Sequence, residues 1–406
     1  MSSAHTGSEK YFFLVMCVMG ACAILSSTMS KNPVLNPFAE SLGTPEAFMG
    51  FVAAASTIPG VLISLPAGSL SDVFGRKKVL LASTIIFASA PFLYVIITSW
   101  WQLVLVRFYH GFATAIFIPV ARAALAEHYP SQKGEKISIF TSATIVGRSI
   151  APFLGGFILS ITIWNYSTLY LAVGVAGIST LFATLVFFKE EDKTAEEHPV
   201  GTSFKRFRES ESVRGWKAVL LNLNILVVSS TEAAARYVYG ALEFFLVGYL
   251  KNVAKLDPSL IGTIMGMQTV LIPVISPFMG RLSDKIGRKI LILAGLTISG
   301  LVLIALPFAA GFAAYLAISV IYGLGFSMVL SSTPALVSDL TTKESYGAAM
   351  GFLGTVMDVG QMLGPIITGF ILATFGYSSS FFSLGATLLG VCALFALHQK
   401  MAGKPA

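Results

Sequence analysis

Ionisable side chains inside long apolar segments are the residues of this sequence whose possible chemistry is easiest to define. Glu232 and Arg236 stand four residues apart, and Glu243 follows seven residues further on, all in one apolar segment. This spacing places acid, base and acid along one side of a helix, where Glu232 and Arg236 can neutralise each other. Asp358 stands alone in a later apolar segment. A buried acid can take up a proton on one side of a barrier and release it on the other, so Asp358, Glu232 and Glu243 are candidate proton carriers. The alternative is that they form structural salt bridges.

Two arginines in apolar segments, Arg148 and Arg236, carry forked donors that suit a carboxylate or a phosphate. They are candidates for binding an anionic substrate, and the sequence leaves this role and proton coupling open. Arg122 is a further arginine in such a segment, and all of these charges are expected to be buried. Side chains near Glu243 and in the next apolar segment can line an adaptable apolar cavity. The candidates for this cavity are Tyr237, Tyr239, Phe244, Phe245, Met267 and Gln268.

The composition requires membrane helices to position these residues. Of the 406 residues, 55% are hydrophobic and 12% are charged, and the mean hydropathy is +0.78. Soluble domains are far less apolar, so the chain is predicted to be a polytopic membrane protein. The net charge of +7 reflects basic residues in short loops beside apolar segments, not a nucleic-acid-binding surface. The sequence has no phosphate-binding loop, metal-ligand spacing or nucleophile–base pair, which argues against an enzyme and against a cofactor.

Twelve apolar segments are each long enough to cross a bilayer core of about 30 Å as a helix. The predicted fold is an all-α membrane protein, with six helices in residues 1–188, a cytoplasmic linker in 189–217 and six helices in 218–406. Of the 27 Lys and Arg residues, 20 lie on the side of the two termini, which the positive-inside rule assigns to the cytoplasm. The predicted segments are Tyr11–Ser30, Ala47–Ala67, Val79–Thr98, Trp101–Ala126, Ile137–Ile161, Ser167–Phe188, Ala218–Leu250, Ser259–Met279, Ile290–Ala310, Phe312–Ser338, Gly347–Thr374 and Ser379–Leu397.

A duplicated motif organises these segments. GSLSDVFGRKK begins at Gly68, and a near copy, GRLSDKIGRK, begins 212 positions later at Gly280. Each copy is a short charged segment between two apolar ones, and its glycines suit a tight loop at the membrane surface. The pattern resembles the signature loop of the major facilitator superfamily, and the resemblance covers nearly the whole chain. It implies two pseudo-symmetric six-helix bundles that rock around a central site, in a monomer in the plasma or inner membrane.

The resemblance also implies a cytoplasmic gate in each half. Glu127 ends the fourth segment and Asp339 ends the tenth, at matching places. Each is expected to meet the Asp and Arg of the signature loop in its own half, in ion pairs weak enough to break and re-form during alternating access. The gate residues are Asp72, Arg76, Glu127, Asp284, Arg288 and Asp339.

Further motifs resemble those of transporters in this superfamily. RFYHGFATA in the fourth segment resembles the family's Arg-x-x-x-Gly motif, which implies proton transfer for Arg107, and His110, where Gln is usual, is a candidate substrate contact. A structural arginine bound to a neighbouring helix is the alternative. GRSIAPFLGG at Gly147 and GQMLGPIITG at Gly360 resemble the antiporter motif of drug exporters, although Ala151 replaces the glycine before the proline in the first copy. Close helix packing alone also explains these glycines.

The expected function is therefore secondary active transport, with export of small hydrophobic or amphipathic compounds in exchange for protons. The first segment ends with Ser27, Thr28 and Ser30, where many proton-coupled drug exporters have an acid. Either the proton site has moved to the C-terminal half or the substrate is not a cation. The alternative is a transporter of a specific organic anion or metabolite, held by Arg148 and Arg236. The expected partners are a small-molecule substrate, protons and the lipid bilayer, with no nucleic acid.

Overall fold

The computed structural model describes residues 2–187, 219–342 and 345–402, and its regular elements are all helices. The predicted linker over residues 189–217 lies outside these ranges. The helices are α1 Ser2–Met29, α2 Leu35–Ser41, α3 Glu46–Ala54, α4 Ile58–Phe74, α5 Arg76–Ile96, α6 Trp100–His128, α7 Lys133–Ile161, α8 Tyr166–Phe187, α11 Leu223–Asn252, α12 Pro258–Ile286, α13 Arg288–Ala305, the 3₁₀ helix η1 Leu306–Phe308, α14 Phe312–Asp339 and α15 Tyr346–Ala402.

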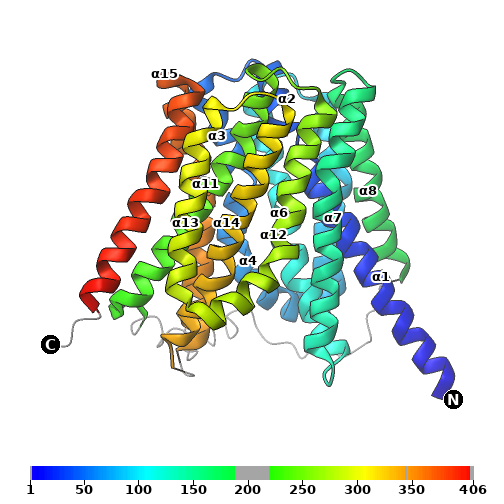
Figure 1. Ribbon diagram of the computed structural model, residues 1–406. Coiled ribbons are helices and arrows are strands. Elements are labelled where there is room, and N and C mark those ends of the chain that lie inside the picture. Colours follow the sequence, from blue (N-terminus) through cyan, green and yellow to red (C-terminus); the bar gives the residue numbers. More distant parts are fainter. Residues whose placement is uncertain (1, 188–218, 343–344, 403–406) are drawn as a thin grey trace. The chain divides into compact units, whose positions relative to one another are not determined.

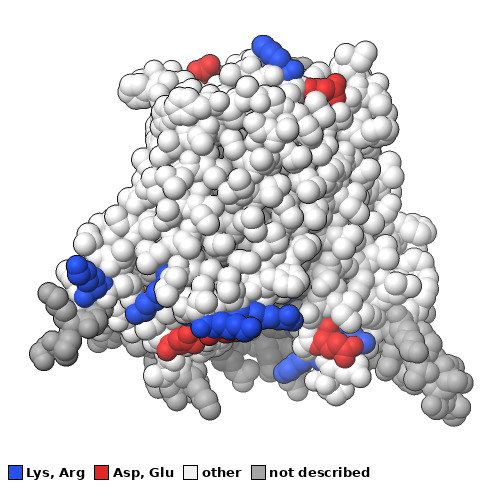
Figure 2. All heavy atoms as spheres, viewed as in Figure 1, with Lys and Arg blue, Asp and Glu red and all other residues white. Residues whose placement is uncertain are grey.

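All twelve predicted apolar segments fall on these helices. Ten of the described helices are long and apolar enough to cross a membrane. The 30-residue α11 carries more charge, and the 57-residue α15 holds two predicted segments that meet at Gly376, where φ is 77°. Figure 2 shows the charged side chains of the visible face near the helix ends, whereas the middle of the helices is uncharged.

The helices group into two compact units. Unit 1 comprises Met1–Thr44, Ala55–Ser203 and Asp257–Gly266, and unit 2 comprises Pro45–Ala54, Phe204–Leu256 and Met267–Ala406. Two of the borders between the units, after Ala54 and after Gly266, fall inside the second and the eighth predicted segments. A helix can therefore belong to one unit at its beginning and to the other at its end.

Unit 1 is built by close packing of α1 on α7 and α8, of α5 on α6 and α8, and of α4 on α6. Lipid is as apolar as a helix surface, so small residues and close contacts hold membrane helices together more than the hydrophobic effect does. Gly147 on α7 shows this directly, because a Cβ atom there would lie 2.2 Å from the Ala21 carbonyl oxygen of α1. The core between α1, α5, α6 and α7 contains Met16, Met19, Leu80, Phe87, Phe117, Val120, Leu125 and Phe140.

Unit 2 follows the same rule. Helix α11 packs on α15, and α13 packs on α14 and α15; α13 and α14 run side by side in Figure 1. A Cβ atom on Gly360 would lie 2.2 Å from the Ala233 carbonyl oxygen, and one on Gly364 would lie 1.9 Å from that of Tyr237. The glycines of the second antiporter-like motif are thus required by the contact between α15 and α11.

The signature segments differ from the expected loops. Helix α4 continues through the first copy to Phe74, and α5 begins at Arg76, so only Gly75 stands between the two helices, with φ of 88°. The second copy has the same form, with Gly287 at φ of 102° between α12 and α13. Only the second glycine of each copy makes the turn, because a left-handed φ is strained for residues with a Cβ atom. The first glycine lies inside the helix.

The second predicted segment was expected to be one helix and is two. Helix α3 ends at Ala54 and α4 begins at Ile58, with a turn over residues 55–57. Pro59 explains the interruption, since it cannot donate a backbone hydrogen bond and fits best in the first turn of a new helix.

Candidate functional site

The ion pair between Glu232 and Arg236 on α11 is the centre of the candidate site in unit 2. Glu232 is completely buried, and its Oε1 lies 3.3 Å from Arg236 Nε. The other carboxylate oxygen, Oε2, has no hydrogen-bond partner among the described residues. The Arg236 side chain is 19% exposed. One buried acid is thus balanced by one long contact to a base that is partly accessible.

This geometry gives a pair that can separate. Strong charge-assisted hydrogen bonds between nitrogen and carboxylate oxygen measure about 2.7–2.9 Å and are often bidentate. A single longer contact compensates less of the several kcal/mol that each buried ion costs. Protonation of Glu232 would therefore remove the ion pair that holds the Arg236 side chain in place.

An aromatic stack supports Arg236. Its guanidinium carbon lies 5.4 Å from the centre of the Phe326 ring on α14, within the range of a cation–π contact. Phe326 stacks on Tyr239 of α11, with ring centres 4.8 Å apart, and on Tyr322, with centres 6.1 Å apart. The stack gives Arg236 a flat apolar support that does not neutralise its charge.

The other predicted carriers are less deeply buried than Glu232. Asp358 on α15 is half-buried, and Arg236 interacts with it electrostatically. Glu243 is half-buried on α11 and has an interaction of its own. Glu232 is the only fully buried acid among the described residues.

Several buried polar groups in unit 2 lack partners. Gln268 on α12 is 2% exposed, and neither its amide oxygen nor its amide nitrogen is hydrogen-bonded. Buried groups of this kind cost about 1–3 kcal/mol each when unpaired, so they mark places where a ligand or a water molecule can bind. Buried hydroxyl groups of unit 2 that likewise have no partner among the described residues belong to Ser229, Ser283, Ser299, Ser319, Tyr322, Ser332 and Thr368.

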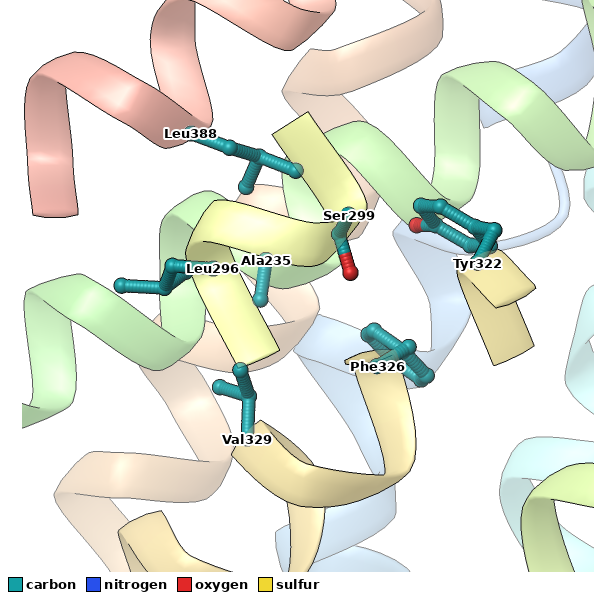
Figure 3. Close-up of a pocket in the computed structure, with 7 residues that line it drawn as sticks. All are labelled: Ala235, Leu296, Ser299, Tyr322, Phe326, Val329 and Leu388. Atoms are coloured by element: carbon teal, nitrogen blue, oxygen red, sulfur yellow. The ribbon is translucent and has the colours of Figure 1, made fainter. Parts of the chain in front are cut away.

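A small pocket adjoins the aromatic stack, because Tyr322 and Phe326 belong to both. It lies between α11, α13, α14 and α15, and Figure 3 shows Ser299 and Tyr322 among its lining residues, with Phe326 below them. Phe326 therefore contacts both the pocket and Arg236. The lining is Ala235, Leu296, Ser299, Tyr322, Phe326, Val329 and Leu388. The sequence does not reveal these pocket-lining residues, because single aromatic and small residues in apolar helices look the same whether they face lipid or a pocket.

The expected cavity around Glu243 differs from this pocket. Phe244 is 5% exposed and packs on Phe245, with ring centres 5.0 Å apart, so it belongs to the core of unit 2. Tyr237 is half-buried beside the contact between α11 and α15. Of the predicted cavity residues, Tyr239 belongs to the stack and Gln268 to the unpaired polar groups.

Two arginines expected to be buried are exposed. Arg148 on α7 and Arg122 on α6 both lie on surfaces of unit 1 that its own helices do not cover. Arg122 donates a long hydrogen bond of 3.5 Å to Thr141. An arginine in an apolar sequence is therefore not necessarily enclosed by its own bundle.

A second polar centre lies in unit 1. Arg107 on α6 is 1% exposed and donates from Nη2 to the hydroxyl of Ser56, in the turn between α3 and α4. His110 is 3% exposed, and its Nδ1 lies 3.2 Å from the Tyr94 hydroxyl. Tyr94 stacks on Tyr170 with ring centres 4.3 Å apart.

The structure brings the predicted gate residues together. Arg76 binds Glu127, with Nη2 2.7 Å from Oε1, and also Ser71. Arg288 binds Asp339, with Nε 2.9 Å from Oδ2, and also Asp284. The side chain of Asp72 lies outside the described part of the structure.

Among the described residues, no group of three or more His, Cys, Asp or Glu side chains can hold a metal ion. The site is built from one buried ion pair, aromatic rings and unpaired neutral polar groups.

Known proteins resemble this chain over nearly its whole length. The chain is 26% identical over 385 residues to the multi-drug resistance efflux pump PmrA of Streptococcus pneumoniae, with 90% of each chain covered. It is 23% identical over 383 residues to the quinolone resistance protein NorA of Staphylococcus aureus, covering 94% of this chain and 93% of that protein. A bacterial homologue of the human lysosomal transporter Spinster has the same fold, with a TM-score of 0.76, 16% identity and 96% of each chain covered.

The profile of the Major Facilitator Superfamily matches residues 12–257 and 228–405. Together these ranges include both signature motifs, both gate pairs and the Glu232–Arg236 site. The chain is a multi-pass membrane transporter and belongs to the Major Facilitator Superfamily.

Proposed function

We propose that this transporter exports small hydrophobic or amphipathic compounds in exchange for protons, and that Glu232 carries the proton. The observation that supports this most directly is the complete burial of Glu232, with one oxygen on Arg236 and the other unpaired. A buried acid that is only half satisfied in its charged form is well placed to bind a proton. Asp358, Glu243 and Arg107 are the other coupling candidates.

The pair suggests how protonation and substrate binding are linked. When Glu232 is charged, it holds Arg236 beside Phe326. When Glu232 takes up a proton, the guanidinium loses its counter-charge and turns toward Asp358, its other electrostatic neighbour. This movement changes the surface next to the aromatic stack, so the proton and the substrate compete through Arg236. Such competition is a coupling free energy between two sites.

Export of hydrophobic compounds is supported by the relatives. PmrA is described as a multi-drug resistance efflux pump and NorA as a quinolone resistance protein. Stacked rings and an adaptable apolar lining suit planar or amphipathic molecules without requiring one exact shape. Tyr237, Tyr239 and Gln268 are the proposed substrate contacts in unit 2.

The remaining predictions complete the proposed mechanism. The halves over residues 1–188 and 218–406 rock as a monomer in the plasma or inner membrane, with both termini in the cytoplasm. The Arg76–Glu127 and Arg288–Asp339 pairs close the cytoplasmic side, because exposed ion pairs are weak enough to open in each cycle.

The test is transport by purified protein in liposomes with an imposed pH gradient, while internal pH is followed as cationic, neutral and anionic compounds are added. We expect substrate-dependent proton movement that is lost in Glu232→Gln. Glu46→Gln is the control, since it makes the same chemical change at an exposed glutamate and should retain coupling. Proton movement that persists in Glu232→Gln and is lost in Asp358→Asn would assign the carrier to α15 instead.

The second candidate is transport of a specific organic anion. It is favoured by the two Nη nitrogens of Arg236, which donate to no acceptor among the described residues, and by the exposed Arg148. Exchange of labelled anions without proton movement would replace the export proposal. Anion transport that survives in Arg148→Glu would remove Arg148 from the clamp.

A further inference from the structure

The buried guanidinium of Arg107 has no counter-charge among the described side chains of unit 1. Its Nη2 donates to the Ser56 hydroxyl, and its Nε has no hydrogen-bond partner. Among the side chains that the structure describes, no carboxylate oxygen lies within 4.0 Å of an Arg107 nitrogen, which is the distance limit for an ion pair. The Tyr94 side chain lies beside it but is also neutral.

The energetic consequence is large. Arginine is always charged in proteins and has five N–H donors to satisfy. A buried ion costs several kcal/mol unless an opposite charge and further hydrogen bonds offset this cost. Neutral hydroxyl groups offset only part of it, so the charge of Arg107 requires an anion.

His110 adds a second unpaired group on the same face. It follows Arg107 by three residues on α6, and positions three apart lie on one side of a helix. Its Nε2 has no partner, whereas Nδ1 lies 3.2 Å from the Tyr94 hydroxyl. When the Tyr94 hydroxyl donates to Nδ1, the neutral imidazole carries its proton on Nε2 and offers it as a donor.

The internal repeat offers a comparison for the position of Arg107, because the matching helix contact in unit 2 forms without an arginine. At the 212-residue spacing of the signature motifs, Gly323 matches Gly111 and Gln268 matches Ser56. A Cβ atom on Gly111 would lie 2.4 Å from the Ser56 carbonyl oxygen, and one on Gly323 would lie 3.7 Å from that of Gln268. Corresponding segments therefore approach each other at matching positions in the two units. In unit 2, Ser319 stands at the position that matches Arg107.

We propose that Arg107 and His110 form a binding site for a monovalent anion in unit 1. Arg107 supplies the charge and its Nε donor, and His110 supplies the Nε2 donor. The anion is either an inorganic halide or the carboxylate group of a transported compound, since both have one negative charge and accept hydrogen bonds. This site is separate from the proton carrier Glu232 and can be tested without transport.

The experiment is thermal unfolding of the purified full-length protein in detergent, at constant ionic strength. Sodium chloride is titrated against sodium isethionate, whose bulky sulfonate serves as the reference anion, and sodium benzoate is titrated in parallel. A ligand that binds only the folded state raises Tm in a saturable manner. We expect this rise in wild-type protein and its loss in Arg107→Gln.

Two further variants make the result specific. Arg122→Gln removes an exposed arginine from the same helix and should keep the full response. His110→Phe keeps an aromatic ring but has no N–H donor, so it should weaken the apparent affinity by about tenfold through loss of one hydrogen bond. A rise with chloride identifies an inorganic anion, and a rise with benzoate alone identifies a carboxylate. An equal Tm in all three salts, or an unchanged response in Arg107→Gln, would overturn the proposal.

Discussion

Arg76 binds Glu127 through two guanidinium nitrogens, with Nη2 2.7 Å from Oε1 and Nε 3.2 Å from Oε2, across 51 positions of the chain. Arg288 binds Asp339 across the same 51 positions. The repeat has thus kept the pair and its place in the helices while exchanging glutamate for aspartate. Because both acids are more than half exposed, these pairs are suited to reversible contact rather than to holding the fold together.

The gate pairs should matter little for stability. We expect a double-mutant cycle of Arg76→Gln and Glu127→Gln to give a coupling energy of about 0.2–1 kcal/mol, because solvent screens the pair. Thermal unfolding of the four proteins measures this energy. Arg288→Gln with Asp339→Asn provides the matched cycle in the other unit. A coupling above about 3 kcal/mol would be typical of a buried pair and would contradict a gate that opens in each cycle.

The Glu232–Arg236 pair should behave differently. Replacing either residue alone leaves a buried or partly buried charge unpaired, so Glu232→Gln and Arg236→Gln should each lower the free energy of unfolding by about 3–5 kcal/mol. The double variant removes both charges and should recover most of this loss. Unfolding by heat and by denaturant measures both effects. Additive losses in the double variant would show that the two side chains do not stabilise each other.

The glycines of α15 give a packing test with an internal control. Gly364→Ala should destabilise unit 2 by about 1–3 kcal/mol, because its Cβ atom would lie 1.9 Å from the Tyr237 carbonyl oxygen and α11 would have to move. Gly354 on the same helix has nothing within 4 Å of the corresponding position. Gly354→Ala should therefore be neutral or stabilise by up to about 1 kcal/mol. Equal melting temperatures of the two variants would argue against the close contact between α11 and α15.

Asp257 provides a prediction for pH. This exposed carboxylate before α12 accepts hydrogen bonds from the Ser259 backbone and hydroxyl and from the Ser160 hydroxyl, at 2.8–2.9 Å. Partial burial raises the pKa of Asp257, but these hydrogen bonds outweigh it and lower the pKa below its ordinary 3.8. A lowered folded-state pKa stabilises the protein above the unfolded-state value, and this stabilisation is lost as pH falls through the folded-state pKa.

We therefore expect Asp257→Asn to lower Tm modestly at neutral pH and to match the wild type at pH well below 3.8. Melting curves of both proteins between about pH 2 and 7 check this. Glu46→Gln, which removes another exposed acid just before a membrane segment, should show no such convergence. A difference in Tm that stays constant over this range would remove the hydrogen-bonded carboxylate as the cause.

The residues of this chain determine much of its architecture without tertiary information. The length and number of apolar segments predicted the membrane helices, since crossing a bilayer requires about 20 apolar residues whatever the neighbours are. The four-residue spacing of Glu232 and Arg236 predicted their contact, because it is set by the pitch of one helix. The resemblance to the superfamily implied the gate pairs, with Glu127 and Asp339 at matching places in the two copies. All of these are local or repeated features.

The tertiary structure alone decided the surroundings of the candidate site. Phe326 stands 90 positions after Arg236, and nothing in its local sequence shows that its ring faces the guanidinium. The meeting of Arg107 with Ser56, the exposure of Arg148 and the closeness of Gly364 to Tyr237 were equally hidden. The physical reason is that lipid and helix interior are both apolar. Periodicity that separates the buried from the exposed face of a soluble helix therefore says little in a membrane, and only the packed helices show which side chains meet.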